Sequence, residues 1–191
     1  MNLPNKLTLM RVILVPVFMI VYLCDFGLGI WRYIIAAAIF AIASFTDFLD
    51  GKIARKRGLV TNLGKFLDPL ADKFIVMASL LCLSFTSAGE GVYGILLVFA
   101  TSIVIFRELA VTSMRLVAAS ADGSVIAAAM LGKIKTTTQM FFIIFAIIEP
   151  AFDVAVFNNH IISYVLMLFM IVMTIWSGLD YLVKYWKYIK E

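Results

Sequence analysis

Charged residues are scarce in this chain: only 15% of its 191 residues are Asp, Glu, Lys or Arg, whereas 63% are hydrophobic. Soluble domains average roughly 25% charged residues, so this composition excludes an ordinary soluble protein and favours one that crosses a membrane several times. Cysteine is also rare, and the two cysteines, Cys24 and Cys82, lie in apolar runs without the spacing of metal ligands. We therefore expect them to be packed as small hydrophobic side chains.

Internal repeats, low-complexity tracts and a second domain are absent from the sequence. The first residues combine positive charge with an apolar run from Val12, as a signal peptide does, but no small-residue cleavage site is evident. We therefore expect the N-terminal segment to be retained as the first membrane span. Residues 1–191 are expected to form a single membrane domain.

Six apolar stretches are long enough, once their polar flanks are included, to cross a bilayer as helices. They are residues 7–24, 30–48, 66–87, 92–117, 136–148 and 160–183. The predicted fold is therefore all-α: a polytopic membrane protein with six transmembrane helices, preceded by a short interfacial segment at residues 2–6. Between the fourth and fifth spans, residues 118–132 are rich in small side chains, and we expect a cytoplasmic helical hairpin there.

Positive charge in the loops and termini is distributed unevenly. With six spans, most Lys and Arg residues lie on one side of the membrane, in its loops or in the two termini, whereas Arg32 lies near the opposite side. The positive-inside rule predicts that this side, and therefore both termini, is cytoplasmic. The C-terminal tail has a pattern typical of an interfacial anchor, because lysines alternate there with the aromatic residues Tyr181, Tyr185, Trp186 and Tyr188.

Four aspartates are conspicuous in so apolar a chain. Asp47 and Asp50 are three residues apart, and Asp68 and Asp72 are four apart, so each pair would share one face of a helix. Carboxylates at the ends of membrane spans are costly unless they are paired, hydrated or bound to cations. Carboxylate oxygens suit hard divalent cations, and four negative charges favour more than one ion. The spacing predicts a divalent metal site, with helix caps and ion pairs as the alternative.

Small and basic residues accompany these acids. Gly51, Ala54 and Gly64 leave the backbone open on the same helix faces, which allows a flat or phosphorylated ligand to approach closely. Arg55 can bind phosphate oxygens with two parallel hydrogen bonds. The segment is therefore predicted to bind a phosphorylated ligand beside the metal site.

The spacing of these residues resembles the signature of the CDP-alcohol phosphatidyltransferases at all eight of its fixed positions. These are Asp47, Asp50, Gly51, Ala54, Arg55, Gly64, Asp68 and Asp72. Further matches resemble the bacterial members that act on glycerol 3-phosphate. They lie at Asn5, Thr8, Arg11, Arg107, Glu108 and residues 132–136.

The resemblance implies transfer of the phosphatidyl group from CDP-diacylglycerol to sn-glycerol 3-phosphate, with release of CMP by direct attack. It implies two divalent cations, Mg²⁺ or Mn²⁺, held by the four aspartates, and we assign the general base to Asp72. It assigns the cytidine diphosphate to Gly51, Ala54, Arg55 and Gly64. It also implies a homodimer in the bacterial cytoplasmic membrane, with its active site on the cytoplasmic side and membrane lipids as partners; no nucleic-acid partner is expected.

Polar residues outside the signature are candidates for further substrate contacts. Thr8 and Arg11 are expected to contact CDP-diacylglycerol from the first span, although a simple interfacial anchor is the alternative for Arg11. A dianionic acceptor phosphate requires cations near the metal site. The candidates are Arg107, Arg115, Lys133 and Lys135.

Glu108, Thr112 and Arg115 share one helical face, so Glu108 is predicted to orient Arg115. A structural arginine paired with glutamate is the alternative to a site residue. The single histidine, His160, is expected on the opposite side in a loop or helix-cap role, which argues against a phosphohistidine mechanism. Other acceptors (inositol phosphate, serine or a phospholipid), an ion-coupled transporter and a scaffold subunit remain as alternatives.

Overall fold

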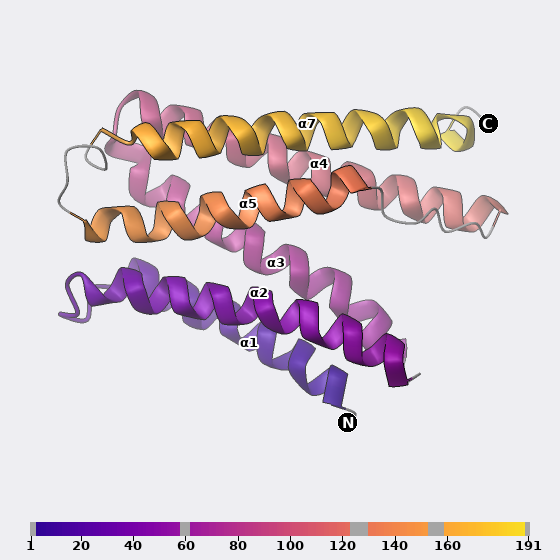
Figure 1. Cartoon of the computed structure of the whole chain (residues 1–191), viewed down its shortest axis with the longest axis horizontal. Helices are drawn as coiled ribbons and strands as arrows, with labels where there is room; N and C mark the ends of the chain where they lie inside the picture. The colour runs from indigo at the N-terminus through magenta and orange to yellow at the C-terminus, as the bar shows by residue number, and fades with distance from the viewer. Residues whose placement is uncertain (1–2, 58–61, 123–129, 153–158, 190–191) are drawn as a thin grey trace.

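The computed structural model describes residues 3–57, 62–122, 130–152 and 159–189. Within these ranges only the backbone is described at residues 3–5, 7, 47–57, 62–69, 72, 119–122 and 187–189. The described chain folds into long α-helices and two short 3₁₀ helices (Figure 1). The α-helices are α1 Leu3–Leu23, α2 Trp31–Arg57, α3 Asn62–Thr86, α4 Val92–Asp122, α5 Met130–Ile148 and α7 Ile161–Ile189. The 3₁₀ helices are η1 Ser87–Gly89 and η2 Glu149–Ala151.

These helices confirm the predicted all-α fold, and each of the six expected spans corresponds to one of them. By length and composition, three apolar segments in the described residues are able to cross a membrane: Val92–Ala118, Met130–Ala151 and Ile161–Trp186. Within the described side chains, Thr8–Leu23, Trp31–Thr46 and Lys73–Gly89 are shorter apolar helices. Long apolar helices of this kind identify a membrane protein.

Two expected segments differ in detail from the helices observed. The interfacial segment expected at residues 2–6 continues directly into the first span, since α1 begins at Leu3. Helix α4 runs on to Asp122 and α5 begins at Met130, so the centre of the hairpin expected at residues 118–132, residues 123–129, lies outside the described residues.

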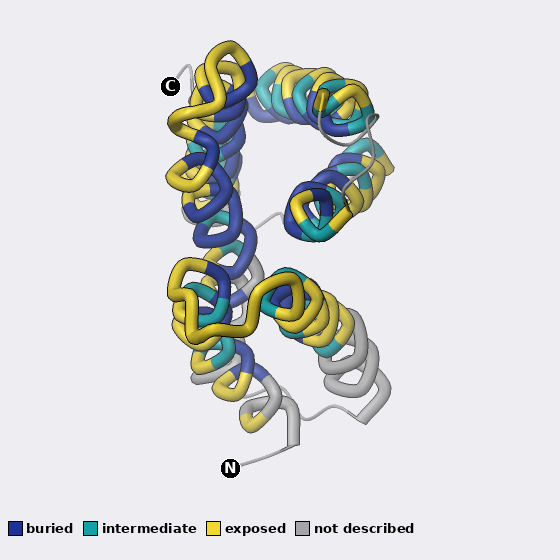
Figure 2. Tube along the Cα trace, turned by 90° about the vertical axis from the view of Figure 1, so that its left-hand side faces the viewer, coloured by how far each residue is buried: buried dark blue, intermediate teal, exposed yellow. Residues whose placement is uncertain are grey.

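The helices pack into one bundle through small and aromatic side chains. Helix α1 packs on α2 and α3, α7 packs on α4 and α5, and α3 contacts α4 and α5. Ala36, Ala43 and Ala100 are buried at these contacts, where small residues allow helices in a membrane to approach closely. Figure 2 shows buried residues where the helices face one another and exposed residues along the outside of the bundle. Much of that outer surface is apolar, as expected for contact with lipid.

Gly94 fixes the connection between α3 and α4. A Cβ atom at this position would lie 2.0 Å from the carbonyl oxygen of Ser87, which belongs to η1. Only glycine allows the first turn of α4 to approach the η1 backbone this closely. The tight turn sends α4 back along the bundle, antiparallel to α3 (Figure 1).

The alternating helix directions bring one set of helix ends together. Figure 1 shows the end of α2 and the start of α3 at the same end of the bundle as the starts of α1 and α5 and the ends of α4 and α7. The end of α5 and the start of α7 lie at the opposite end (Figure 1). The helix η2, which follows α5, and His160, which directly precedes α7, therefore lie there too. Residues far apart in the sequence are thereby gathered where the signature lies.

Candidate active site

The signature residues occupy the facing ends of two helices that pack together. Asp47, Asp50, Gly51, Ala54 and Arg55 all lie in α2, which ends at Arg57. Gly64, Asp68 and Asp72 lie in α3, which begins at Asn62. The expectation that one helix ends with the first pair of acids and the next begins before the second pair is therefore confirmed for the backbone.

The contacts of these eight side chains lie outside the described residues. Among the side chains that the structure does describe, no three His, Cys, Asp or Glu residues gather into a metal site. The fit to a divalent cation therefore depends on the donor set itself, four carboxylates on two adjacent helices. Carboxylate oxygens without nitrogen or sulfur ligands are the chemistry that Mg²⁺ and Mn²⁺ prefer.

A buried ionic network joins α4, α5 and α7 near the middle of the bundle. Glu108 accepts a hydrogen bond from Nη1 of Arg107 at 3.0 Å and another from Nζ of Lys135. The other terminal nitrogen of Arg107, Nη2, donates to Oγ of Ser177 on α7 at 3.1 Å. Lys135 is only 2% exposed and Glu108 only 9%, so each charge needs its partner to remain ionised in this environment.

This network corrects the predicted role of Glu108. The helical spacing suggested that Glu108 orients Arg115, but its carboxylate pairs with Arg107 and Lys135 instead. Arg107 is offset by about 100° on the helix, yet its long side chain reaches the neighbouring carboxylate. Arg115 lies two turns further along α4, where its Nη2 donates to the hydroxyl of Tyr181 at 2.5 Å.

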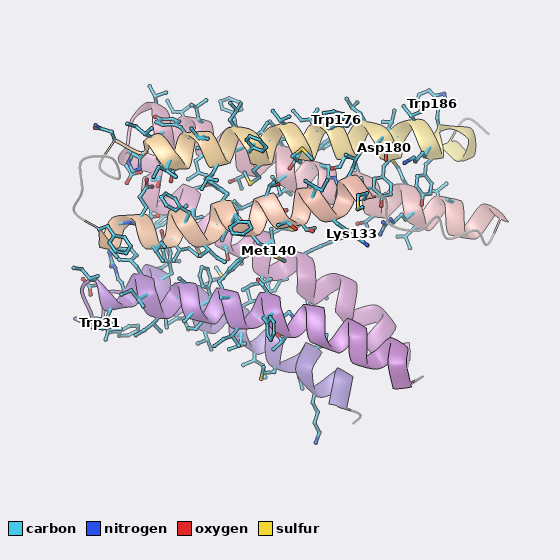
Figure 3. All side chains as sticks on the ribbon, in the orientation of Figure 1. Trp31, Lys133, Met140, Trp176, Asp180 and Trp186 are labelled. Carbon is cyan, nitrogen blue, oxygen red and sulfur yellow. The ribbon has the colours of Figure 1, made fainter. Side chains whose placement is uncertain are left out.

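A cavity of about 270 Å³ lies beside this network, between α3, α4, α5 and α7. Four cations and one carboxylate line it, together with smaller polar and apolar residues. The lining is Lys73, Arg107, Glu108, Val111, Thr112, Arg115, Gly132, Lys133, Thr136 and Tyr181. Figure 3 shows Lys133 near the start of α5, in the half of the molecule where the signature helices meet.

The cavity carries excess positive charge. Glu108 is already paired with Arg107 and Lys135. Within the described side chains, no carboxylate lies within ion-pair distance of Arg115 or Lys133. A partly enclosed site with excess cations attracts anions strongly because solvent screening is weaker there. The cavity therefore suits a phosphate group.

Three of the four predicted acceptor cations are brought together here: Arg107, Arg115 and Lys133. The fourth, Lys135, lines a small adjoining cavity of about 20 Å³ and is buried against Glu108. Arg107, Arg115 and Lys133 therefore line the larger cavity, whereas Lys135 pairs with Glu108 and holds its carboxylate in place.

Lys73 and Thr112 line the cavity although neither was among the predicted site residues. Lys73 donates to Oγ1 of Thr112, which in turn donates to the backbone oxygen of Glu108 at 2.7 Å. The sequence signal for Lys73 was its position directly after Asp72, at the start of an apolar run. Through Lys73, the cavity touches α3, the helix that carries Gly64, Asp68 and Asp72 of the signature.

Tyr181 was expected in an interfacial anchor, and that expectation is wrong for Tyr181 and Tyr185. They are 2% and 1% exposed, and their rings stack with centroids 5.8 Å apart. The guanidinium of Arg115 also lies 5.0 Å from the centre of the Tyr181 ring. Trp186, by contrast, is exposed, as an anchor would be (Figure 3).

Thr8 and Arg11 lie on α1, which packs against both signature helices. Both side chains are completely buried. An interfacial anchor would extend its charge toward the membrane surface, so burial excludes that alternative for Arg11. Arg11 instead brings a positive charge into the interior of the bundle, on the helix next to α2 and α3.

His160 lies far from this cavity, as predicted. It directly precedes α7, and its carbonyl oxygen accepts from the backbone N–H of Tyr164 at 2.8 Å. Its ring stacks on Tyr93 with centroids 4.1 Å apart, and its Nδ1 lies 3.0 Å from Glu149. These contacts give His160 a structural role at the opposite end of the bundle.

Comparison with known proteins agrees with this arrangement. The family model described as CDP-alcohol phosphatidyltransferase matches residues 1–176. A Bacillus subtilis protein named CDP-diacylglycerol–glycerol-3-phosphate 3-phosphatidyltransferase is 39% identical, over 99% of this chain and 97% of its own length. Proteins of the same name from Yersinia enterocolitica and Salmonella paratyphi A are 35% and 34% identical, over 100% and 95% of this chain and 98% and 93% of their own lengths. The signature on α2 and α3, the helical membrane fold and these matches lead to one conclusion: the chain is an enzyme of the CDP-alcohol phosphatidyltransferase family.

Proposed function

We propose that this enzyme transfers the phosphatidyl group of CDP-diacylglycerol to sn-glycerol 3-phosphate, giving phosphatidylglycerophosphate and CMP. The names of relatives that match nearly the whole chain support this reaction. The observation that carries the choice of acceptor is the cationic cavity, which contacts α3 through the residue that follows Asp72. A phosphate-bearing acceptor needs such a cavity, whereas a neutral alcohol does not.

The signature provides the proposed donor site. We assign Gly51, Ala54, Arg55 and Gly64 to the cytidine diphosphate, with small residues allowing close approach and Arg55 binding a phosphate. Thr8 and Arg11 contribute from α1, whose burial against α2 and α3 supports a role inside the bundle.

Asp47, Asp50, Asp68 and Asp72 would hold two divalent cations, Mg²⁺ or Mn²⁺. When bound, the ions would offset negative charge on the diphosphate and on the departing CMP. The four carboxylates fit this role because they carry four negative charges, and among the eight signature positions only Arg55 carries a positive charge. Bound divalent cations would neutralise the remaining charge.

We assign proton removal to Asp72. Its carboxylate takes the proton from the acceptor hydroxyl, whose oxygen attacks the phosphorus that carries diacylglycerol. The bond from that phosphorus to the CMP oxygen breaks as the new one forms, so no covalent enzyme intermediate is needed. A carboxylate next to cations is a weak base, so Asp72 must act mainly through its position.

The cavity provides the acceptor site. Arg115 and Lys133 bind the phosphate of glycerol 3-phosphate, and Tyr181 holds the guanidinium of Arg115 in place through a hydrogen bond of 2.5 Å. Arg107 adds charge at the cavity wall while its Nη groups remain bound to Glu108 and Ser177. Lys135 acts on the acceptor indirectly, by holding Glu108.

The same proposal includes the wider organisation of the enzyme. The chain acts as one membrane domain over residues 1–191 and as a homodimer in the bacterial cytoplasmic membrane. The signature end of the bundle and both termini face the cytoplasm. The excess of Lys and Arg in the loops at that end supports this orientation.

The decisive experiment supplies purified protein with CDP-diacylglycerol, Mg²⁺ or Mn²⁺, and one acceptor at a time. Glycerol 3-phosphate is expected to give CMP and phosphatidylglycerophosphate in equal amounts. Inositol phosphate, serine and a phospholipid serve as competing acceptors. A faster reaction with any of these would overturn the proposed acceptor, and absence of CMP release with every acceptor would overturn the reaction.

A further inference from the structure

A polar cavity of about 320 Å³ lies at the end of the bundle opposite to the signature. The ends of α1, α3 and α5 and the starts of α2 and α4 form its walls, together with η1, η2 and His160. Its volume is at the lower end of the roughly 300–1,000 Å³ that is typical of small-molecule sites. The proposed reaction does not use this cavity.

The cavity lies level with one surface of the bilayer. The apolar segment Thr8–Leu23 ends there, and the span Val92–Ala118 begins there. Phe26 and Trp31 are exposed at the same end, and Figure 3 shows Trp31 at the start of α2, far from Lys133. Exposed aromatic residues at the ends of spans are typical of the depth at which lipid headgroups lie. Lipid headgroups are therefore within reach of this cavity.

Opposite charges line the cavity without pairing with each other. Among the described residues, Arg32 and Glu90 both line it but do not form an ion pair. The guanidinium of Arg32 lies 3.9 Å from the exposed carboxylate of Asp25, and the carboxylate of Glu90 lies 3.7 Å from Nε2 of His160. Both separations exceed hydrogen-bonding distance, so Arg32 and Glu90 each keep bonding capacity for a ligand.

Glu149 adds negative charge on the side of Glu90. Its carboxylate lies 3.0 Å from Nδ1 of His160, the ring whose other nitrogen approaches Glu90. Glu149 is only 4% exposed, so it acts on a ligand through its electrostatic field and not by contact. The cavity therefore presents positive charge from α2 and negative charge from η2 and from the connection between η1 and α4.

The guanidinium of Arg32 is held in the same way as that of Arg115 in the cationic cavity. Nη2 of Arg32 donates to the hydroxyl of Tyr33 at 2.5 Å, and the guanidinium lies 4.6 Å from the centre of that ring. Arg115 makes the same two contacts with Tyr181, at 2.5 Å and 5.0 Å. A guanidinium that is held in place with N–H groups to spare is suited to binding a phosphate. The carboxylate of Glu90 is correspondingly suited to an ammonium group.

We propose that this cavity binds the phosphoethanolamine headgroup of a bilayer phospholipid, with its phosphate at Arg32 and its ammonium at Glu90. This headgroup carries both charges on one short ethylene link, and its primary ammonium has N–H donors for a carboxylate. The carboxylates of Glu90 and Glu149 would repel a simple anion, and Arg32 would repel a simple cation. The acyl chains of the lipid extend into the surrounding bilayer.

Native mass spectrometry of the purified full-length protein in detergent tests the proposal by measuring the affinity for dioleoylphosphatidylethanolamine. The protein is expected to bind this lipid about fivefold more tightly than the phosphatidylcholine with the same chains, whose quaternary ammonium has no N–H to donate to Glu90. Glu90→Gln should abolish that preference. The matched control Asp180→Asn removes a carboxylate at the other end of the bundle and should preserve it.

Arg32→Gln is expected to weaken the binding of both lipids about tenfold, because it removes the charge that binds their phosphate. Lys184→Gln, which removes a cation at the other end of the bundle, should leave both affinities unchanged. Tyr33→Phe is a milder variant that keeps the ring and removes only the hydroxyl that holds Arg32. It is expected to weaken both lipids about threefold.

Three results would overturn the proposal: equal affinity of the wild type for the two lipids, a preference that survives Glu90→Gln, or displacement of the lipid by equimolar CDP-diacylglycerol. Glycerophosphoethanolamine carries the same headgroup without acyl chains and should not displace the lipid at equal concentration. Complete displacement would assign the cavity to a soluble ligand and overturn its assignment to a lipid. Because binding is measured without turnover, failure of the proposed reaction would leave these results unaffected.

Discussion

The guanidinium of Arg115 and the phenol of Tyr181 join α4 to α7 at the wall of the cationic cavity. Nη2 of Arg115 donates to the Tyr181 hydroxyl at 2.5 Å, and the guanidinium lies over the same ring. Long arginine side chains lose conformational freedom when they bind a ligand, and a partner that holds them beforehand reduces that loss. In the proposed acceptor site, Tyr181 would therefore hold Arg115 in place before an anionic ligand binds.

Replacing Tyr181 with phenylalanine tests this role. Tyr181→Phe keeps the ring but removes the hydroxyl, and a hydrogen bond to a charged group contributes about 1.5–3 kcal/mol. The KM for glycerol 3-phosphate is expected to rise about tenfold, with little change in kcat or in the KM for CDP-diacylglycerol. Steady-state CMP release measures all three.

Tyr164→Phe is the matched control, because Tyr164 lies on α7 at the opposite end of the bundle, in contact with Tyr93. It should leave the KM for the acceptor unchanged. If Tyr181→Phe raised the KM for glycerol 3-phosphate and the KM for CDP-diacylglycerol equally, Tyr181 would affect the whole site and not the acceptor pocket alone.

Glu108 is expected to be more important for stability than for binding. Glu108→Gln leaves Lys135 and Arg107 buried without their carboxylate, and breaking one side of a buried ion pair costs about 3–5 kcal/mol. The variant should unfold at a clearly lower temperature than the wild type. Thermal unfolding in one detergent measures the difference.

A double-mutant cycle tests whether Glu108 and Lys135 stabilise each other directly or whether each substitution only damages the bundle in general. The combined variant of Glu108→Gln and Lys135→Gln should be more stable than the sum of the two single losses predicts, by about 1–3 kcal/mol. Strict additivity would contradict a direct energetic pairing of Glu108 with Lys135.

Asp68→Asn tests the proposed metal site. The amide preserves size but removes one of four negative charges, and turnover with CDP-diacylglycerol is expected to vanish while the unfolding temperature stays close to that of the wild type. Asp25→Asn, at the opposite end of the bundle, is the control and should retain full activity. Wild-type activity in the Asp68 variant would refute the metal assignment.

Removal of divalent cations provides an independent test of the same site. Treatment with a chelator should abolish CMP release, and excess Mg²⁺ or Mn²⁺ should restore it. Metal that stabilises the native state should also raise the unfolding temperature of the wild type, by mass action, but not that of Asp68→Asn. Full activity of the chelated enzyme would exclude a metal-dependent reaction.

His160 is expected to influence stability alone. His160→Ala removes the ring that stacks on Tyr93 and the contact with the buried Glu149, so the unfolding temperature should fall. Below that temperature, kcat and both KM values should match those of the wild type. A selective loss of kcat would assign this end of the bundle a part in the reaction.

The sequence alone was sufficient to predict the helices and the place of the signature at the end of α2 and the start of α3. Long apolar runs are a strong signal because every backbone polar group in lipid must be satisfied within the helix. The end of α2 and the start of α3 were expected from the regular spacing of Asp47, Asp50, Asp68 and Asp72 along the chain. Both inferences depend on local periodicity, which a single sequence contains.

The contacts of the cationic cavity could not be predicted in the same way. We predicted that Glu108 pairs with Arg115 because they share a face of α4. In the structure, Lys135 on α5 binds Glu108, and Ser177 on α7 binds Arg107. Tyr181 resembled an interfacial anchor for a similar reason: an aromatic residue among lysines has the same local pattern whether it faces lipid or a cavity. These features arise between helices, and helical spacing does not encode them.

Arg107 lines the cationic cavity and also a second, apolar cavity between α4 and α7. Its two terminal nitrogens are bound to Glu108 on α4 and to Ser177 on α7. A change in the separation of α4 and α7 would therefore shift one of the cations that line the cationic cavity. The electrostatic potential that an anion meets in that cavity thus depends on how closely these two helices pack.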